Sequence, residues 1–260
     1  MSPAAYIRRT GSEFLSALQF LTRIPVPSQP YEVDALSRAV KFFPLVGIVV
    51  GGIAALLHLL LAPHLPRLVA AFLVVLCLVL VTGCLHEDGL ADTADGFGGG
   101  NDREQILRIL RDSRIGSYGG IALGLSLLGR IVLIASLPLA QVATYLIVAH
   151  MLCRWTTLPL SYFLPSARTQ TEGQEFNGQG ARIARLTSTG TLIGGTLFSF
   201  AVAACLLRTG AVAPILVSIA LTALTGLYYK RRIGGVTGDC FGATNQLAEI
   251  GVYLCGAWTL

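Results

Sequence analysis

Long, almost uninterrupted apolar blocks constrain this chain more than any other feature of its sequence. A helix that crosses the hydrocarbon layer of a membrane needs about 20 mostly apolar residues. Six segments meet that requirement and a seventh is weaker because polar residues interrupt it: Phe42–Ala62, Leu68–Leu85, Ile121–Leu137, Val142–Phe163, Thr191–Leu207, Ala211–Tyr229 and, as the weaker one, Phe241–Leu260. We therefore predict an all-α, polytopic membrane bundle of six or seven helices, with residues 1–260 forming a single membrane-embedded domain.

The composition excludes an ordinary soluble domain. Charged residues make up 13% of the 260 residues, whereas soluble domains carry about 25%. Arginines interrupt residues 1–40, so we interpret this region as a cytoplasmic or interfacial segment and not as a signal peptide. The six cysteines have no CxxC spacing and lie mostly in apolar runs. Their pattern favours packing in the bundle over disulfides or zinc.

The positive charges predict the orientation of the chain. When the N-terminus is cytoplasmic and every apolar run crosses once, 15 of the 19 Lys and Arg residues fall on the cytoplasmic side, including Arg182 and Arg185. Only Arg67 and Arg208 fall on the opposite side. This distribution follows the positive-inside rule. It explains the formal net charge of +5 without nucleic-acid binding, and we expect the bilayer itself to be the partner.

The acidic residues predict a site on the same side. Seven of the 14 Asp and Glu residues lie between Glu87 and Asp112, directly after the second apolar run. Asp88, Asp92 and Asp95 have the spacing i, i+4 and i+7, which places their carboxylates on one face of a helix. Mg²⁺ removes the repulsion between such carboxylates and binds substrate phosphates as well. The alternative interpretation is a solvated acidic helix end, but acids this close to lipid are usually functional.

Two further features of the same segment predict phosphate contacts. His86 is either a phosphate contact or proton carrier, or an interfacial residue whose ring bonds to backbone. The glycines that follow the acids predict a mobile turn whose backbone amides approach phosphate, although turns contain glycine anyway: Gly96, Gly98, Gly99 and Gly100.

Two later polar segments extend the predicted site. Residues 103–120 read as a short helix that ends in Arg111 and Arg114 on either side of Asp112 and Ser113, a combination suited to phosphate. The arginines also suit the positive anchor of the next span. Residues 230–249 place Asp239, Asn245 and Glu249 at the entry of the weak seventh span. They form either a second wall of the site or a polar helix packed against its neighbours.

The remaining isolated polar residues carry weaker predictions. Arg154 lies inside an apolar run, so its side chain faces the bundle interior or extends to the cytoplasmic edge. His58, His64 and His150 stand alone in apolar or loop surroundings, and we interpret them as incidental to the chemistry.

Together these segments resemble the adenosylcobinamide-GDP ribazoletransferase family, also called cobalamin synthase. The resemblance extends over nearly the whole chain. Residues 164–168 depart from the family in having Ser166 where we expect Tyr. The segments that carry the resemblance are FLTRIPVP (20–27), FPLVGIVVGG (43–52), HEDGLADTADG (86–96), RDSRIGSYG (111–119) and GVTGDCFGA (235–243).

The resemblance implies the last assembly step of cobalamin in a bacterial inner membrane. A ribose hydroxyl of α-ribazole, or of its 5′-phosphate, attacks the cobinamide-bound phosphorus of adenosylcobinamide-GDP, and GMP leaves. Family members need Mg²⁺, which we assign to Asp88, Asp92 and Asp95. Arg111 and Arg114 then offset charge on the phosphates. Asp239 completes the metal site or accepts the proton, with His86 as the reserve base. Residues assigned to substrate binding are Asp112, Ser113, Asn245, Glu249, Gly98 and Gly99. The sequence leaves a homo-oligomer open.

Three other functions compete with this interpretation. The CDP-alcohol phosphatidyltransferases carry DxxDGxxAR, and here Asp92–Gly96 begins that pattern but Phe97 and three glycines follow. Prenyl-diphosphate transferases carry two Asp-rich motifs, and this sequence lacks such a pair. A transporter predicts acids near the middle of several spans, whereas these acids collect at span ends and in loops.

Overall fold

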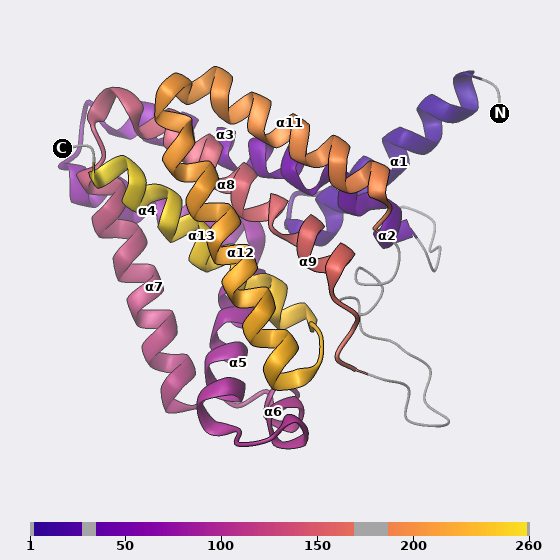
Figure 1. Cartoon of the computed structure of the whole chain (residues 1–260). Coiled ribbons are helices and arrows are strands. Elements are labelled where there is room, and N and C mark those ends of the chain that lie inside the picture. Colours follow the sequence, from indigo (N-terminus) through magenta and orange to yellow (C-terminus); the bar gives the residue numbers. More distant parts are fainter. Residues whose placement is uncertain (1–2, 28–34, 169–186, 259–260) are drawn as a thin grey trace.

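The protein, described from a computed structural model, is a helical bundle (Figure 1). The structure describes residues 3–27, 35–168 and 187–258, so Arg182 and Arg185 lie outside the described residues. The described part contains no strand, only an isolated parallel bridge between Ser166 and Val236. The α-helices are α1 (Pro3–Leu21), α2 (Ala35–Ala39), α3 (Phe43–Leu61), α4 (Arg67–Thr82), α5 (Leu85–Gly99), α6 (Arg103–Ile109), α7 (Ser117–Ser136), α8 (Val142–Trp155), α9 (Thr157–Phe163), α11 (Thr189–Leu207), α12 (Val212–Ile233) and α13 (Gly238–Trp258), and the 3₁₀ turns are η1 (Val40–Phe42), η2 (Leu139–Gln141) and η3 (Arg208–Ala211).

A sharp bend separates the apolar helix α4 from the acidic helix α5. The two helices meet at 89°. Gly83 ends α4 in the left-handed region with φ 63°, and Cys84 follows with φ 62°. Glycine adopts that conformation without a steric penalty, whereas a residue with a Cβ adopts it only where its surroundings hold it. The bend therefore turns the acidic residues away from the axis of α4.

Glycines allow the central helices to approach closely. A Cβ added at Gly47 in α3 would collide with the carbonyl oxygen of His150 in α8, and one at Gly51 would lie 2.6 Å from the carbonyl oxygen of Leu146. Two small residues four positions apart, on one face of a helix, are typical of close packing between membrane helices. These contacts fix α8 against α3 in the middle of the bundle.

A second close approach joins α5 to α13. A Cβ at Gly89 would lie 2.9 Å from the carbonyl oxygen of Asp239, and one at Gly242 would lie 3.2 Å from the Cα of Gly89. Gly89 follows Asp88 directly in the chain. Two acidic segments about 150 residues apart in sequence are thus held side by side, and the absence of side chains at these glycines makes that possible.

The surface agrees with a membrane environment. Among the described residues, three helical stretches are long and apolar enough to cross a membrane, namely Leu36–Leu61, Ser117–Ser136 and Thr189–Ile233, and the bent pair α4–α5 adds a fourth if it counts as one span. Helix α7 exposes large apolar side chains along its length, among them Ile121, Leu125 and Leu128 at 63%, 67% and 63%. An apolar surface of this extent on a helix suits contact with lipid.

The structure divides the predicted spans differently from the sequence. Thr191–Leu207 and Ala211–Tyr229 both fall within the 45-residue stretch Thr189–Ile233, and the chain turns between α11 and α12 at η3 (Figure 1). Val142–Phe163, predicted as one span, is broken at Thr156 into α8 and α9. Helix α8 has only 14 residues, fewer than the roughly 20 that a straight crossing needs.

Two local predictions were wrong. The glycines after Asp95 do not form a mobile turn, because α5 continues to Gly99 and only Gly100 is extended. Arg232 of α12 donates a hydrogen bond to the carbonyl oxygen of Gly100 at 2.7 Å, which holds this helix end. The helix predicted over residues 103–120 ends at Ile109, and α7 begins at Ser117 after a loop.

Candidate active site

A pocket of about 270 Å³ lies where α5 meets α13. Asp88 of α5 and Asp239 at the start of α13 both line it. Phe20 and Phe43 supply an apolar wall. A pocket with an apolar wall and a few convergent charged groups is the usual form of a small-molecule site. The other polar residues in its wall are His86, Arg154, Thr157, Ser166, Arg168, Thr237 and Asn245.

Asp239 is held by two donors. Its Oδ2 accepts a hydrogen bond from Nη2 of Arg168 and another from the hydroxyl of Thr237, both at 3.1 Å. The bridge between residues 165–167 and Val236 sets this geometry, because Ala167 and Val236 each donate a backbone hydrogen bond across it at 2.9 Å. Burial raises the pKa of the Asp239 carboxyl although Arg168 and Thr237 lower it. The protein thus holds a partly desolvated carboxylate at the pocket wall.

The three acids of α5 have different surroundings. Asp88 is exposed, Asp92 is half-buried, and no described residue donates a hydrogen bond to either. The carboxylate of Asp92 is repelled by Asp88, Asp239 and Asp95. Asp95 is buried, and its two oxygens accept backbone hydrogen bonds from Gly116 at 2.7 Å and Gly119 at 2.8 Å. Asp95 therefore fixes the beginning of α7 to α5.

A basic groove lies beside the pocket. It is lined by Arg103, Glu104, Leu107, Arg108, Arg111, Ala167 and Arg168, so Arg168 belongs to both cavities. Arg103 donates hydrogen bonds to the carbonyl oxygens of Ala167 at 2.7 Å and Ile233 at 3.0 Å, and thereby joins α6 to α12. Arg108 and Arg111 form no ion pair with a described residue and remain exposed. Their guanidinium groups are free to meet phosphate.

The loop after α6 is more exposed than the pocket. Arg114 donates to Asp112, with Nη2 at 2.6 Å from Oδ2. This hydrogen bond holds the pKa of the Asp112 carboxyl down to about 2. Neither Asp112, Ser113 nor Arg114 lines the pocket or the groove.

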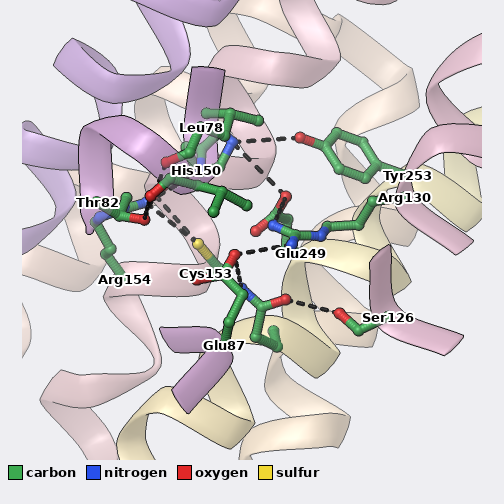
Figure 2. Close-up of polar contacts among 12 residues, drawn as sticks. Leu78, Thr82, Glu87, Ser126, Arg130, His150, Cys153, Arg154, Glu249 and Tyr253 are labelled. Carbon is green, nitrogen blue, oxygen red and sulfur yellow. Dashed lines mark hydrogen bonds and ion pairs between the residues drawn. The ribbon is translucent and has the colours of Figure 1, made fainter. Parts of the chain in front are cut away.

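A buried polar network lies behind the pocket and joins α5, α7, α8 and α13 (Figure 2). Arg130 of α7 pairs with Glu87 at 2.8 Å and faces Glu249 at 3.5 Å. Gln246 donates to Glu87 at 3.3 Å and accepts from Ser126 at 2.8 Å. Paired charges are what a buried site tolerates. The structure places Glu249 in this network and not in the pocket wall.

Of the remaining predicted site residues, some line the pocket and others lie outside it. His86 and Asn245 are both buried and line the same pocket as Arg154. Gly98 and Gly99 are exposed at the end of α5, outside the pocket. Sequence reasoning did not assign Arg154 or Arg168 to the site. A charge inside an apolar run was the available signal for Arg154.

Comparison with known proteins identifies the family. Residues 13–257 match the family model described as cobalamin-5-phosphate synthase. The chain belongs to this family. A relative from Azorhizobium caulinodans named adenosylcobinamide-GDP ribazoletransferase is 45% identical over 90% of this chain and 91% of its own length. Relatives with the same name from Polaromonas sp. and Vibrio cholerae are 39% and 36% identical over 93% and 96% of this chain, and 95% of each relative. No solved structure matches the chain significantly.

The donor set of this cobalamin-5-phosphate synthase family member suits Mg²⁺. Asp88 and Asp92 offer carboxylate oxygens that no described donor occupies, and Asp239 offers Oδ1 beside the bonded Oδ2. Hard oxygen ligands, with open positions for water and phosphate, are what Mg²⁺ requires. Among the described residues, the ligand atoms of a buried trio, His150, Cys153 and Glu249, all lie within 4.8 Å of one another, whereas those of Asp88, Asp92 and Asp239 do not. Arg130 and Arg154 contact members of that trio, and their positive charges oppose a second cation.

Proposed function

We propose that the protein transfers the adenosylcobinamide-phosphate group of adenosylcobinamide-GDP to α-ribazole or α-ribazole 5′-phosphate. GMP is released, and adenosylcobalamin or its 5′-phosphate forms. Membership of the cobalamin-5-phosphate synthase family supports the reaction. The observation that carries it is the pocket in which Asp88 and Asp239 from two distant segments face a shared space beside arginines.

Asp88 and Asp92 are the residues that would hold Mg²⁺. The ion would supply charge neutralisation on the diphosphate. Asp95 supports this set indirectly, because its backbone hydrogen bonds hold α7 against α5. Phosphoryl transfer depends mainly on positioning and on neutralising charge, and both are supplied by this arrangement of carboxylates and arginines.

The protein's own side chains carry the proton and the leaving group. The ribose hydroxyl attacks phosphorus, its proton passes to a carboxylate at the pocket wall, and the bond to the GMP oxygen breaks. Asp239 is the residue we assign as proton acceptor, because it lines the pocket opposite Asp88. Arg108 and Arg111 in the adjoining groove are placed to receive the phosphate of departing GMP.

The membrane arrangement follows from charge and surface. We propose a bacterial inner-membrane protein with six or seven crossings and a cytoplasmic N-terminus. The basic residues gather in the segments next to the site, and lipid-facing apolar side chains cover α7. This arrangement opens the pocket to the cytoplasm.

Replacement of Asp92 by Asn tests the reaction and the metal together. GMP release would be measured from adenosylcobinamide-GDP and α-ribazole in liposomes at several Mg²⁺ concentrations. Mutation of a residue that only supports a metal ligand typically lowers metal affinity or activity by about 10–100-fold. We therefore expect Asp92→Asn to lower the rate of GMP release by at least about 100-fold, and EDTA to abolish release by the wild type.

Asp102→Asn is the matched control. Asp102 is exposed outside the pocket and accepts a hydrogen bond from the backbone of Gln105 at 2.8 Å, and Asn caps a helix about as well as Asp. We expect it to keep wild-type rates. Normal release from Asp92→Asn, or wild-type release without divalent cations, would refute the metal assignment. No release from the wild type with either acceptor would refute the function.

A further inference from the structure

Arg154 is a buried cation that also lines the pocket. It lies near the end of α8, its relative exposure is 1%, and it forms part of the pocket wall. The hydrogen bonds that it donates all come from Nη1. They reach Nδ1 of His150 at 3.1 Å, the carbonyl oxygen of His150 at 3.0 Å and the sulfur of Cys153 at 3.6 Å (Figure 2). Every one of these acceptors is an uncharged group on α8.

The nearby carboxylates form ion pairs with another arginine, Arg130. Glu87 and Glu249 both lie within ion-pair distance of Arg130. Between Glu249 and Arg154 lies the ring of His150, whose Nε2 is 3.7 Å from Oε1 of Glu249. No carboxylate of a described residue forms an ion pair with Arg154. A buried charge without a direct counter-charge is costly, and buried charges in proteins are as a rule paired.

The free edge of the guanidinium is the edge that suits phosphate. Nε of Arg154 is buried and has no acceptor, and Nη2 donates to no described residue. These two nitrogens form the side-on pair of donors that binds two oxygens of a phosphate in parallel. Asp88 and Asp239 line the same pocket as Arg154. A phosphate bound in this pocket would therefore have Arg154 as a donor and Asp88 as a residue that would hold Mg²⁺.

We propose that Arg154 binds a phosphate group of a substrate at the closed end of the pocket, through Nε and Nη2. The identity of that substrate rests on the proposed function, and two phosphates have the required chemistry. One is the diphosphate of adenosylcobinamide-GDP. The other is the 5′-phosphate of the acceptor. Arg154 is then a substrate-binding residue of the reaction, supplied by the central helix of the bundle.

Steady-state kinetics of GMP release by Arg154→Met distinguish whether Arg154 binds the diphosphate of adenosylcobinamide-GDP or the 5′-phosphate of the acceptor. A hydrogen bond to a charged group corresponds to about 10–100-fold in affinity. If the donor diphosphate binds here, the KM for adenosylcobinamide-GDP rises by that factor with either acceptor. If the acceptor phosphate binds here, the KM for α-ribazole 5′-phosphate rises and that for α-ribazole stays unchanged. Unchanged KM values for all three substrates, with or without a fall in kcat, would overturn the proposal.

Two companion variants separate binding from folding. Arg154→Lys keeps the charge and loses the paired donors, so we expect a smaller rise in the same KM. Arg154→Lys also keeps the test decisive when Arg154→Met does not fold. If Arg154→Met is unfolded and Arg154→Lys has wild-type KM values, Arg154 has a structural role and the proposal is overturned. Arg231→Met removes an exposed arginine at the end of α12, outside both cavities, and should match the wild type.

A binding measurement keeps the test independent of transfer activity. The melting temperature of the purified protein in detergent would be measured with Mg²⁺ and, in separate samples, inorganic pyrophosphate or inorganic phosphate. The wild type and Arg231→Met should be stabilised by pyrophosphate, and Arg154→Met should lose that shift if the diphosphate binds at Arg154. If the wild type released no GMP, the proposed reaction would fail. The increases in melting temperature with pyrophosphate and with phosphate would still decide the role of Arg154. If Arg154→Met keeps both increases, the protein does not bind phosphate through this side chain.

Discussion

At the scale of single residues, Arg130 is the charge on which the buried network depends. It is 1% exposed and stands between Glu87 and Glu249. Removing one partner of a buried ion pair leaves an uncompensated charge and typically costs about 3–5 kcal/mol. We expect Arg130→Met to lower the stability of the detergent-solubilised protein by that amount, because two buried carboxylates would lose their counter-charge. Thermal or chemical unfolding would measure the loss.

Arg114→Met is the contrasting variant. Its pair with Asp112 lies at the surface, where the arginine side chain is 87% exposed. Solvent screens such pairs, so we expect no measurable change in unfolding. If Arg130→Met were as stable as Arg114→Met, the network would contribute nothing to the cohesion of α5, α7 and α13.

The sequence predicted which residue types gather at the site, but not how each one is used. The spacing of Asp88, Asp92 and Asp95 predicted one helix face, and all three do lie on α5. It could not reveal that the backbone amides of Gly116 and Gly119 donate hydrogen bonds to both carboxylate oxygens of Asp95, because those donors come from the beginning of another helix. Likewise Arg154 had no assigned partner in the sequence, since its neighbours in the pocket come from other elements.

At the scale of elements, the contact between α5 and α13 sets the distance between the two acidic segments. Gly89 has backbone atoms of Asp239 and Gly242 at 2.9 Å and 3.1 Å from the place of an added Cβ. Forcing extra atoms into a packed contact typically costs about 1–3 kcal/mol. We expect Gly89→Ala to separate the helices and lower the rate of GMP release well below that of the wild type, because Asp88 and Asp239 would no longer meet across the pocket.

Gly124→Ala is the control for that change. Gly124 lies inside α7, and an added Cβ there would meet no atom within 4 Å. Alanine in an exposed helix interior is favoured over glycine by about 1 kcal/mol, so this variant should keep full activity and unfold at the same or higher temperature. Equal activity in Gly89→Ala and Gly124→Ala would show that the close approach is not needed for the site.

Elements that owe their form to tertiary contacts were the ones the sequence misjudged. The apolar block Val142–Phe163 was predicted as one span although it contains Pro159, which cannot donate a helical hydrogen bond to Trp155. The helix breaks at Thr156, whose hydroxyl donates to the carbonyl oxygen of Cys153 at 2.6 Å. The glycines after Asp95 predicted a turn, but packing keeps them helical, since an added Cβ at Gly98 would lie 2.7 Å from the ring of Tyr118. Apolar length and glycine content describe a segment alone, and these outcomes depend on its neighbours.

At the scale of the whole molecule, the position of the active-site pocket relative to the bilayer determines whether substrates reach it. Helix α6, whose residues line the groove, lies beside the N-terminal end of α7, and the end of α13 lies towards the other end of α7 (Figure 1). The loop between α3 and α4 precedes the bent pair, and the loop at residues 100–102 follows it. If the bent pair counts as one span, these two loops lie on opposite sides of the membrane.

Cysteine labelling tests that arrangement. His64 and Asn101 are exposed in the two loops, and the exposed native cysteines, Cys84 and Cys205, would be replaced by Ser. With the site in the cytoplasm, a membrane-impermeant maleimide should label His64→Cys in intact spheroplasts, and Asn101→Cys only in inside-out vesicles. Labelling of both from one side would make α4–α5 a re-entrant pair and remove one crossing. Labelling of Asn101→Cys alone in spheroplasts would place the acidic pocket outside the cell, away from cytoplasmic nucleotides, and the positive charges would then be on the side that the positive-inside rule disfavours.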